Sequence, residues 1–123
     1  MPGLGDRFAG SALRVPVPDG SITDLTVVLR EPAAAADINA AFRAASADSF
    51  RGIIDYSEAP IVSSDVVGNA ASCVFDAPLT QSRGRLAKVF GWYDNEWAYS
   101  HRLADLAEII GRQLDASSAS SAA

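Results

Sequence analysis

The sequence predicts an α+β domain in which an antiparallel-rich sheet carries two main helices packed on one face. Two observations predict the sheet: apolar and polar residues alternate over several short segments, and turn-forming Gly and Pro residues separate those segments. A third predicts the helices, because two longer segments place apolar residues at helical spacing. The length of 123 residues suits one core. We expect residues 1–114 to form the domain and the Ser/Ala-rich residues 115–123 to be a disordered tail.

Two antiparallel strands are expected near the start of the chain. Apolar residues alternate with other residues over residues 11–17 and again over residues 22–29. Pro18-Asp19-Gly20 between them is a strong turn signal, since Pro presets φ and Gly tolerates a positive φ. The short connection therefore predicts that these two segments pair with each other.

The remaining elements follow from the same patterns. Residues 34–47 predict an amphipathic helix whose Ile38 and Phe42 face the core. Further short strands are expected at residues 50–56, 72–77 and 85–93, with an extended segment at 61–65 and a polar loop at 80–84. A last helix is expected from about residue 97 to residue 114, and its apolar stripe consists of Leu103, Leu106, Ala107, Ile110 and Leu114.

Charge and composition restrict the classes of partner. The formal net charge is −5 and no Lys/Arg-rich run is present, so we expect no nucleic-acid partner. No apolar run reaches the ~20 residues that cross a bilayer, and the first ten residues show no signal peptide. The single cysteine, Cys73, excludes an intramolecular disulfide and suits the reducing cytoplasm, where we expect the chain to be. We expect no metal site.

Residues 92–100 read Trp-Tyr-Asp-Asn-Glu-Trp-Ala-Tyr-Ser and lie where the last expected strand meets the last helix. This segment resembles a signature near the C-terminus of glyceraldehyde-3-phosphate dehydrogenases, and several other segments, in order, resemble parts of the last third of those enzymes. The others are residues 10–16 (ending in Arg-Val-Pro), 21–25 (Ser-Ile-Thr-Asp-Leu), 51–58 (Arg-Gly-Ile-Ile-Asp-Tyr-Ser-Glu), 62–65 and 75–77. The resemblance implies the fold of that family's C-terminal domain.

The resemblance also implies roles for individual residues. Arg14 corresponds to an arginine that helps bind phosphate, and a guanidinium is suited to that anion. Asn95 corresponds to the asparagine that contacts the nicotinamide carboxamide, with Tyr99 beside it. Ala98 stands where the family has Gly and adds a methyl group near that contact. The family's catalytic cysteine, its histidine and its dinucleotide-binding domain have no counterpart in this sequence, so we expect no cofactor unless a partner chain supplies a nucleotide-binding domain for NAD.

Each of these residues also has a structural interpretation. Arg14 fits a structural or surface role better than it fits half of a phosphate site whose other groups are missing, and either Asp94 or Asn95 can cap the last helix. Nothing near Cys73 lowers the pKa of its thiol, which predicts a buried, inert side chain. His101 lies on the last helix and is expected to be exposed and not catalytic.

Three functions are compatible with the sequence, and whether the chain is an enzyme stays open. The first is a stand-alone, degenerate dehydrogenase-like domain that binds a small molecule or acts as an accessory protein and is not itself a dehydrogenase. The second is a cofactor-independent isomerase or cyclase of a biosynthetic pathway, for which Tyr56, Asp76 and Tyr93 are the catalytic candidates. The third is a fragment of an NAD-dependent glyceraldehyde-3-phosphate dehydrogenase. In each case we expect a homo-oligomer or a protein partner to cover the sheet face.

Overall fold

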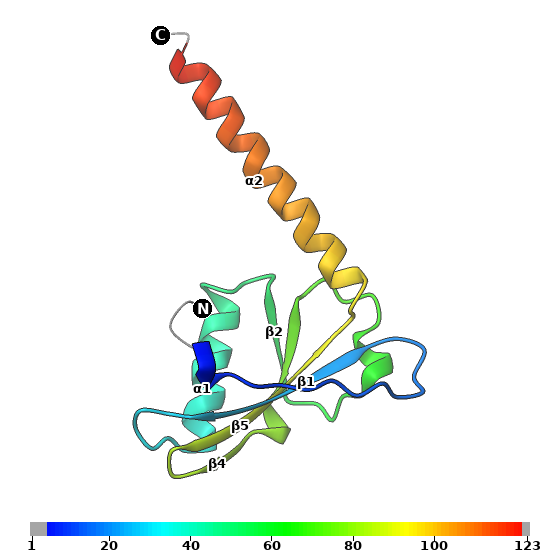
Figure 1. The fold of residues 1–123 in the computed structure, drawn as a ribbon, viewed down its shortest axis with the longest axis vertical. Helices are drawn as coiled ribbons and strands as arrows, with labels where there is room; N and C mark the ends of the chain where they lie inside the picture. Colours follow the sequence, from blue (N-terminus) through cyan, green and yellow to red (C-terminus); the bar gives the residue numbers. More distant parts are fainter. Residues whose placement is uncertain (1–4, 122–123) are drawn as a thin grey trace.

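The computed structural model describes residues 5–121 and shows one five-stranded sheet, with one helix packed against it and a second helix extending away from it (Figure 1). The strands are β1 (Ser21–Val28), β2 (Ile54–Ser57), β3 (Cys73–Asp76), β4 (Gln81–Arg83) and β5 (Leu86–Tyr93). The helices are α1 (Ala35–Ala47) and α2 (Trp97–Ser121), and short 3₁₀ turns lie at Gly5–Arg7, Ser63–Val66 and Ala77–Leu79. The predicted α+β class is confirmed.

Strand β5 organises the sheet. The strand order is β1-β5-β3-β2, and β4 forms a hairpin with β5. The pairs β1–β5, β3–β5 and β4–β5 are antiparallel, whereas β2 and β3 are parallel. The sheet is therefore mixed rather than purely antiparallel, because the chain crosses over between β2 and β3 instead of turning back in a hairpin.

The predicted strand over residues 11–17 is wrong. The segment has no strand structure, and Leu13 is 89% exposed. The partner of β1 is β5, in a register that runs from Ser21 opposite Tyr93 to Val28 opposite Leu86. Pro16 and Pro18 have no N–H to donate to a ladder, which disfavours a strand over residues 11–17, and β1 remains the edge strand of the sheet.

Three other boundaries differ from the predictions. The strand expected from residue 50 begins at Ile54, because residues 50–53 form turns that include Gly52 at φ +77°. The segment expected to be extended at 61–65 is largely the 3₁₀ turn Ser63–Val66, where the Asp65 carboxylate accepts from the Val62 N–H at 2.8 Å. The polar loop at 80–84 contains β4, which Gly84 connects to β5 at φ +63°.

Helix α1 covers one face of the sheet through an aromatic stack. Phe75 of β3 is 1% exposed, and its ring stacks on Phe42 of α1 with centroids 4.0 Å apart. Tyr56 of β2 stacks on the same ring at 5.7 Å, and Ile38 packs against this cluster. The predicted inward positions of Ile38 and Phe42 are confirmed. Full burial of such a side chain, as for Phe75, contributes about 1.5–3 kcal/mol.

Helix α2 does not pack on the sheet, in contrast to the prediction. It leaves the end of β5 and projects from the domain (Figure 1), and four large members of its apolar stripe, Leu103, Leu106, Ile110 and Leu114, are exposed. Arg102 ties its base to the domain by donating to the Gly52 carbonyl at 3.0 Å and the Ser72 hydroxyl at 3.3 Å. The apolar stripe indicates that α2 needs a covering surface, but it does not require that surface to be the chain's own sheet.

The part of the expected tail that the structure describes is helical, since α2 continues to Ser121. Alanine favours helix, and the Ser117 hydroxyl donates to the Gln113 carbonyl at 3.0 Å one turn earlier. Residues 122–123 of that tail lie outside the described residues. No helix within residues 5–121 combines the length and the hydropathy of a membrane span.

Candidate functional site

A small pocket lies where β5 ends and α2 begins, and we call it the junction pocket. Its volume is about 220 Å³, and it is lined by Ser72, Tyr93, Asp94, Asn95, Ala98, Tyr99 and Arg102. It brings together Asn95 and Tyr99, the predicted nicotinamide contacts, with Tyr93, one of the catalytic candidates. Drug-sized ligands need about 300–1,000 Å³, so this pocket suits a single ring or one end of a larger molecule.

Helix α2 supplies three of the lining residues, Ala98, Tyr99 and Arg102, whose spacing places them along one side of the helix. Asp94 and Asn95 precede the helix, in the turn that connects it to β5. Tyr93 comes from the last residue of β5, and Ser72 from the residue before β3. The pocket is therefore built by the strand-to-helix junction together with one loop.

Asp94 holds this junction in place. Its side chain is buried at 3% exposure, and Oδ1 accepts from the N–H groups of Trp97 at 2.8 Å and Glu96 at 3.0 Å. Its Oδ2 accepts from the Gly68 N–H at 2.9 Å, which links α2 to the loop before β3. Of the two predicted capping residues, Asp94 is thus the cap. The Gly68 N–H, followed by that of Trp97, lowers the pKa of Asp94 by stabilising the carboxylate.

Asn95 and Tyr99 lie at the open side of the pocket. The Asn95 Oδ1 accepts from the Ser21 hydroxyl at 3.3 Å, and its Nδ2 has no hydrogen-bond partner among residues 5–121. Tyr99 is 64% exposed, which leaves its ring available to a ligand. Ala98, in contrast, is 3% exposed, so its methyl group is part of the closed side of the pocket.

Ser72 and Arg102 line the pocket but were not among the predicted site residues. Arg102 donates to Ser72 and Gly52, and it pairs with Asp105 at 2.8 Å on its own helix. Its position three residues after Tyr99 could have identified it, because that spacing places two residues on the same face of a helix. Ser72 gives no comparable signal, since only the folded structure brings it to α2.

The chain matches the family model described as glyceraldehyde 3-phosphate dehydrogenase, C-terminal domain, over residues 1–95. It belongs to this family. The match covers the sheet, α1 and the beginning of the junction with α2. The expectation that the chain has the fold of this family's C-terminal domain is therefore confirmed.

Enzymes carrying the family name are close relatives in sequence. The chain is 52% identical to glyceraldehyde-3-phosphate dehydrogenase 2 of Streptomyces arenae and 53% identical to the glyceraldehyde-3-phosphate dehydrogenase of Mycobacterium avium, in both cases over 114 residues. These alignments cover 93% of this chain and 34% of each relative. The chain thus spans about a third of the length of the curated relatives it matches.

The junction pocket fits one end of the cofactor that the family implies. The pocket offers the Asn95 amide, whose Nδ2 donates to no group in the described part of the chain, and the Tyr93 and Tyr99 rings beside it. These groups suit a planar aromatic ring that carries an amide, such as nicotinamide, which accepts a hydride when it is part of bound NAD. The pocket has no room for the remainder of a dinucleotide, and the sequence contains no Gly-rich pyrophosphate motif.

The other catalytic candidates do not line this pocket. Tyr56 pairs across β2–β3 with Phe75 and shares its face of the sheet, on which α1 packs. Asp76 is the next residue of β3, so it points to the opposite face, where it accepts from Trp92 Nε1 at 2.8 Å. Tyr56 and Asp76 are therefore on opposite sides of the sheet, and Tyr93 alone of the three lines the pocket.

Arg14 lies on the irregular segment before β1 and is exposed, and it lines neither of the pockets described here. Cys73 is half-buried, and burial raises the pKa of its thiol, which agrees with the prediction of an inert side chain. His101 is half-buried and contacts the Trp97 ring edge-on at 5.3 Å, so it is less exposed than predicted. No grouping of His, Cys, Asp and Glu side chains in residues 5–121 could hold a metal ion.

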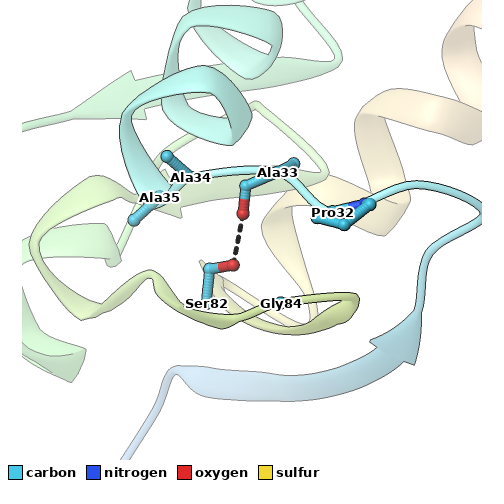
Figure 2. A pocket seen from close by; sticks show the side chains of 6 residues that line it. All are labelled: Pro32, Ala33, Ala34, Ala35, Ser82 and Gly84. Carbon is cyan, nitrogen blue, oxygen red and sulfur yellow. Dashed lines mark hydrogen bonds between the residues drawn. The ribbon is translucent and has the colours of Figure 1, made fainter.

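A second hollow is larger, but no titratable side chain lines it. It has a volume of about 410 Å³ and is lined by Pro32, Ala33, Ala34, Ala35, Ser82 and Gly84 (Figure 2). Its only side-chain hydroxyl, on Ser82, donates to the Ala33 carbonyl and so holds the β4 hairpin against the start of α1 (Figure 2). The hollow contains no titratable side chain, so we assign the candidate site to the smaller junction pocket.

Proposed function

We propose that this chain is a small-molecule-binding or accessory domain whose junction pocket receives the nicotinamide end of a dinucleotide. The observation that carries the proposal is the convergence of Tyr93, Asn95 and Tyr99 on one pocket of ring size. The unpartnered Nδ2 of Asn95 supplies a hydrogen-bond donor, and the exposed Tyr99 ring supplies a flat apolar surface. The single cysteine fits a reducing cytoplasm as the place where this binding occurs.

The same chain is not proposed to carry out hydride transfer alone. Its relatives named as dehydrogenases are about three times as long, and only 34% of their length aligns with this sequence. The pocket holds an amide and two phenols but no thiol, since Cys73 is not among its lining residues. We expect NAD-dependent aldehyde oxidation by this chain alone to be absent, and measurable turnover would contradict the accessory role.

The binding proposal predicts the effect of Asn95→Ala. In a titration of ¹⁵N-labelled chain followed by NMR, nicotinamide should bind with a Kd of roughly 1–10 mM, as expected for a single ring in a shallow pocket. Removing the Asn95 amide should weaken binding about tenfold, because one hydrogen bond to the ligand is lost. The shifted resonances should be those of Ala98, Tyr99 and Arg102.

Gln113→Ala is the matched control, since it removes an exposed amide from the same helix outside the pocket. This variant should bind nicotinamide as the unchanged chain does. Equal affinities of the Asn95→Ala variant and the unchanged chain, or shifts confined to another surface, would show that the junction pocket is not the ligand site.

We also propose that a second copy of the chain covers part of the sheet. Val28 of β1 is 71% exposed, and Leu86, its partner across the ladder, is also exposed, as is Ile22 on the same face. Three exposed apolar side chains on one sheet face favour an interface. Association of identical chains would cover the same patch on both copies.

The variant Val28→Lys with Leu86→Glu tests this association. The new charges lie directly opposite each other in the β1–β5 register, so they can pair within one chain and leave the fold intact. Sedimentation equilibrium at about 100 μM should show dimers of the unchanged chain and at least a tenfold weaker association of the variant. Leu13→Lys, which changes an exposed apolar residue outside the strands, should associate normally. A monomer at every concentration would exclude the interface.

A further inference from the structure

A single side-chain hydrogen bond connects β1 to the junction pocket. The Ser21 hydroxyl donates to the Asn95 Oδ1 at 3.3 Å, across 74 positions of sequence. Ser21 is the first residue of β1, and it pairs across the ladder with Tyr93, two residues before Asn95. Ser21 itself does not line the pocket. It meets the lining through its ladder partner Tyr93 and through this hydrogen bond to Asn95.

The backbone fixes the position of the Ser21 hydroxyl. The preceding Gly20 has φ +87°, a conformation that other residues rarely adopt, and its N–H donates to the Asp19 carboxylate at 2.6 Å. A Cβ at Gly20 would lie 2.8 Å from the Ser63 carbonyl oxygen, so this turn is pressed against a neighbouring segment. On its other side, Ser21 begins an eight-residue strand. The backbone that carries the Ser21 hydroxyl is therefore held in place on both sides.

In this structure the Asn95 amide turns its oxygen towards the Ser21 hydroxyl. The amide is planar, with its oxygen and nitrogen about 120° apart on the same carbon, so Nδ2 is directed elsewhere than Oδ1. No group in residues 5–121 accepts a hydrogen bond from Nδ2. If the amide were reversed, two donors would face each other at Ser21 unless its hydroxyl rotated to accept.

We propose that Ser21 is a positioning residue: by holding Asn95 Oδ1, it presents Asn95 Nδ2 as a donor, so that the junction pocket selects ring ligands that carry a carbonyl oxygen. This inference rests on the proposed function, since it refines which chemical group the same pocket recognises. Recognition depends on the acceptor of the ligand, so a primary amide binds more tightly than the same ring without a carbonyl group.

The test compares two ligands on four forms of the full-length chain. Nicotinamide carries the carbonyl oxygen, and 3-methylpyridine has the same ring without it. Ser21→Ala should weaken nicotinamide binding about fivefold and leave 3-methylpyridine binding unchanged, because only the oriented donor is lost. Ser21→Thr keeps a hydroxyl at a strand position that suits β-branched residues, so it should restore nicotinamide selectivity. Asn95→Ala should abolish the selectivity entirely.

The Asn95 side-chain amide resonances provide a readout that does not need a ligand. Their chemical shifts should change in Ser21→Ala and return close to the original values in Ser21→Thr. The melting temperatures of all forms should agree, which shows that the fold is unchanged. Nicotinamide binding that falls in Asn95→Ala but not in Ser21→Ala would overturn the role of Ser21 and leave the proposed function intact. Absence of nicotinamide binding to the unchanged chain would overturn the proposed function. The amide resonances would then decide the role of Ser21 alone, and unmoved resonances in Ser21→Ala would refute it.

Discussion

Replacing Asp94 with Ala is expected to lower the melting temperature by about 10 °C, because three backbone donors lose their acceptor at once. Two of these donors, on Glu96 and Trp97, open helix α2, and the third belongs to Gly68 in the loop before β3. The loss therefore uncaps a helix and also separates it from the domain. Thermal unfolding followed by circular dichroism measures the effect.

Asp37→Ala is the matched control for Asp94→Ala. The Asp37 carboxylate also accepts from a backbone N–H at the start of a helix, but it receives one bond, from Ala34 at 3.2 Å, in an exposed position. Its loss should lower the melting temperature by no more than about 3 °C. Equal effects of the two variants would mean that Asp94 acts as an ordinary helix cap and does not secure the junction.

The lowered pKa of Asp94 adds a dependence on pH. Since the three N–H groups hold its folded-state pKa below the ordinary value of 3.8, folding favours the carboxylate over the acid. The resulting stabilisation is complete above about pH 5 and is lost as the pH falls through the folded-state pKa. Asp94→Asn, which cannot ionise, should therefore be less stable than the unchanged chain at pH 7. The difference in melting temperature should shrink towards pH 3, and a constant difference would contradict this origin.

Local patterns were sufficient to predict α1 and most of the sheet. Helical spacing placed Ile38 and Phe42 on the buried face of α1, and alternation identified β1, β3 and β5 within a few residues. The same alternation failed over residues 11–17, because a strand depends on its partner as well as on its own pattern. There, Pro16 has no N–H to donate to a ladder, and β1 pairs with β5 on one side while its other side remains the edge of the sheet.

The candidate site was predictable only where its residues share a short segment. Tyr93, Asn95 and Tyr99 lie within one motif, so the sequence already placed them together. The positions of Ser21 and Ser72 depend on the sheet register and on a loop, which no local pattern encodes. Asp76 and Tyr56 were grouped as catalytic candidates, but they lie on opposite faces of the sheet. One step along a strand moves a side chain to the other face, and the sequence does not show which face each residue occupies.

Gly91→Ala is expected to destabilise the fold by about 2 kcal/mol, because the new methyl group would collide with the Cys73 side chain of the neighbouring strand β3. Gly91 lies in β5 opposite Phe75 of β3, and a Cβ there would fall well inside the van der Waals contact distance of Cys73 Sγ. The next nearest atom, the Cβ of Cys73, would be 3.9 Å away, which is ordinary contact. The sulfur atom is thus the single obstacle, and urea unfolding measures its effect.

A double-mutant cycle with Cys73→Ala isolates this obstacle. Alone, Cys73→Ala removes the half-buried sulfur and should cost about 1 kcal/mol. In the double variant, the new methyl group occupies the space that the sulfur leaves, and alanine is favoured over glycine within a strand by about 0.5–1 kcal/mol. The double variant should therefore be at least as stable as Cys73→Ala, which corresponds to a coupling of about 2 kcal/mol. Additive losses would instead show that the β3–β5 backbones themselves exclude a side chain at residue 91, since the close approach would then persist without the sulfur.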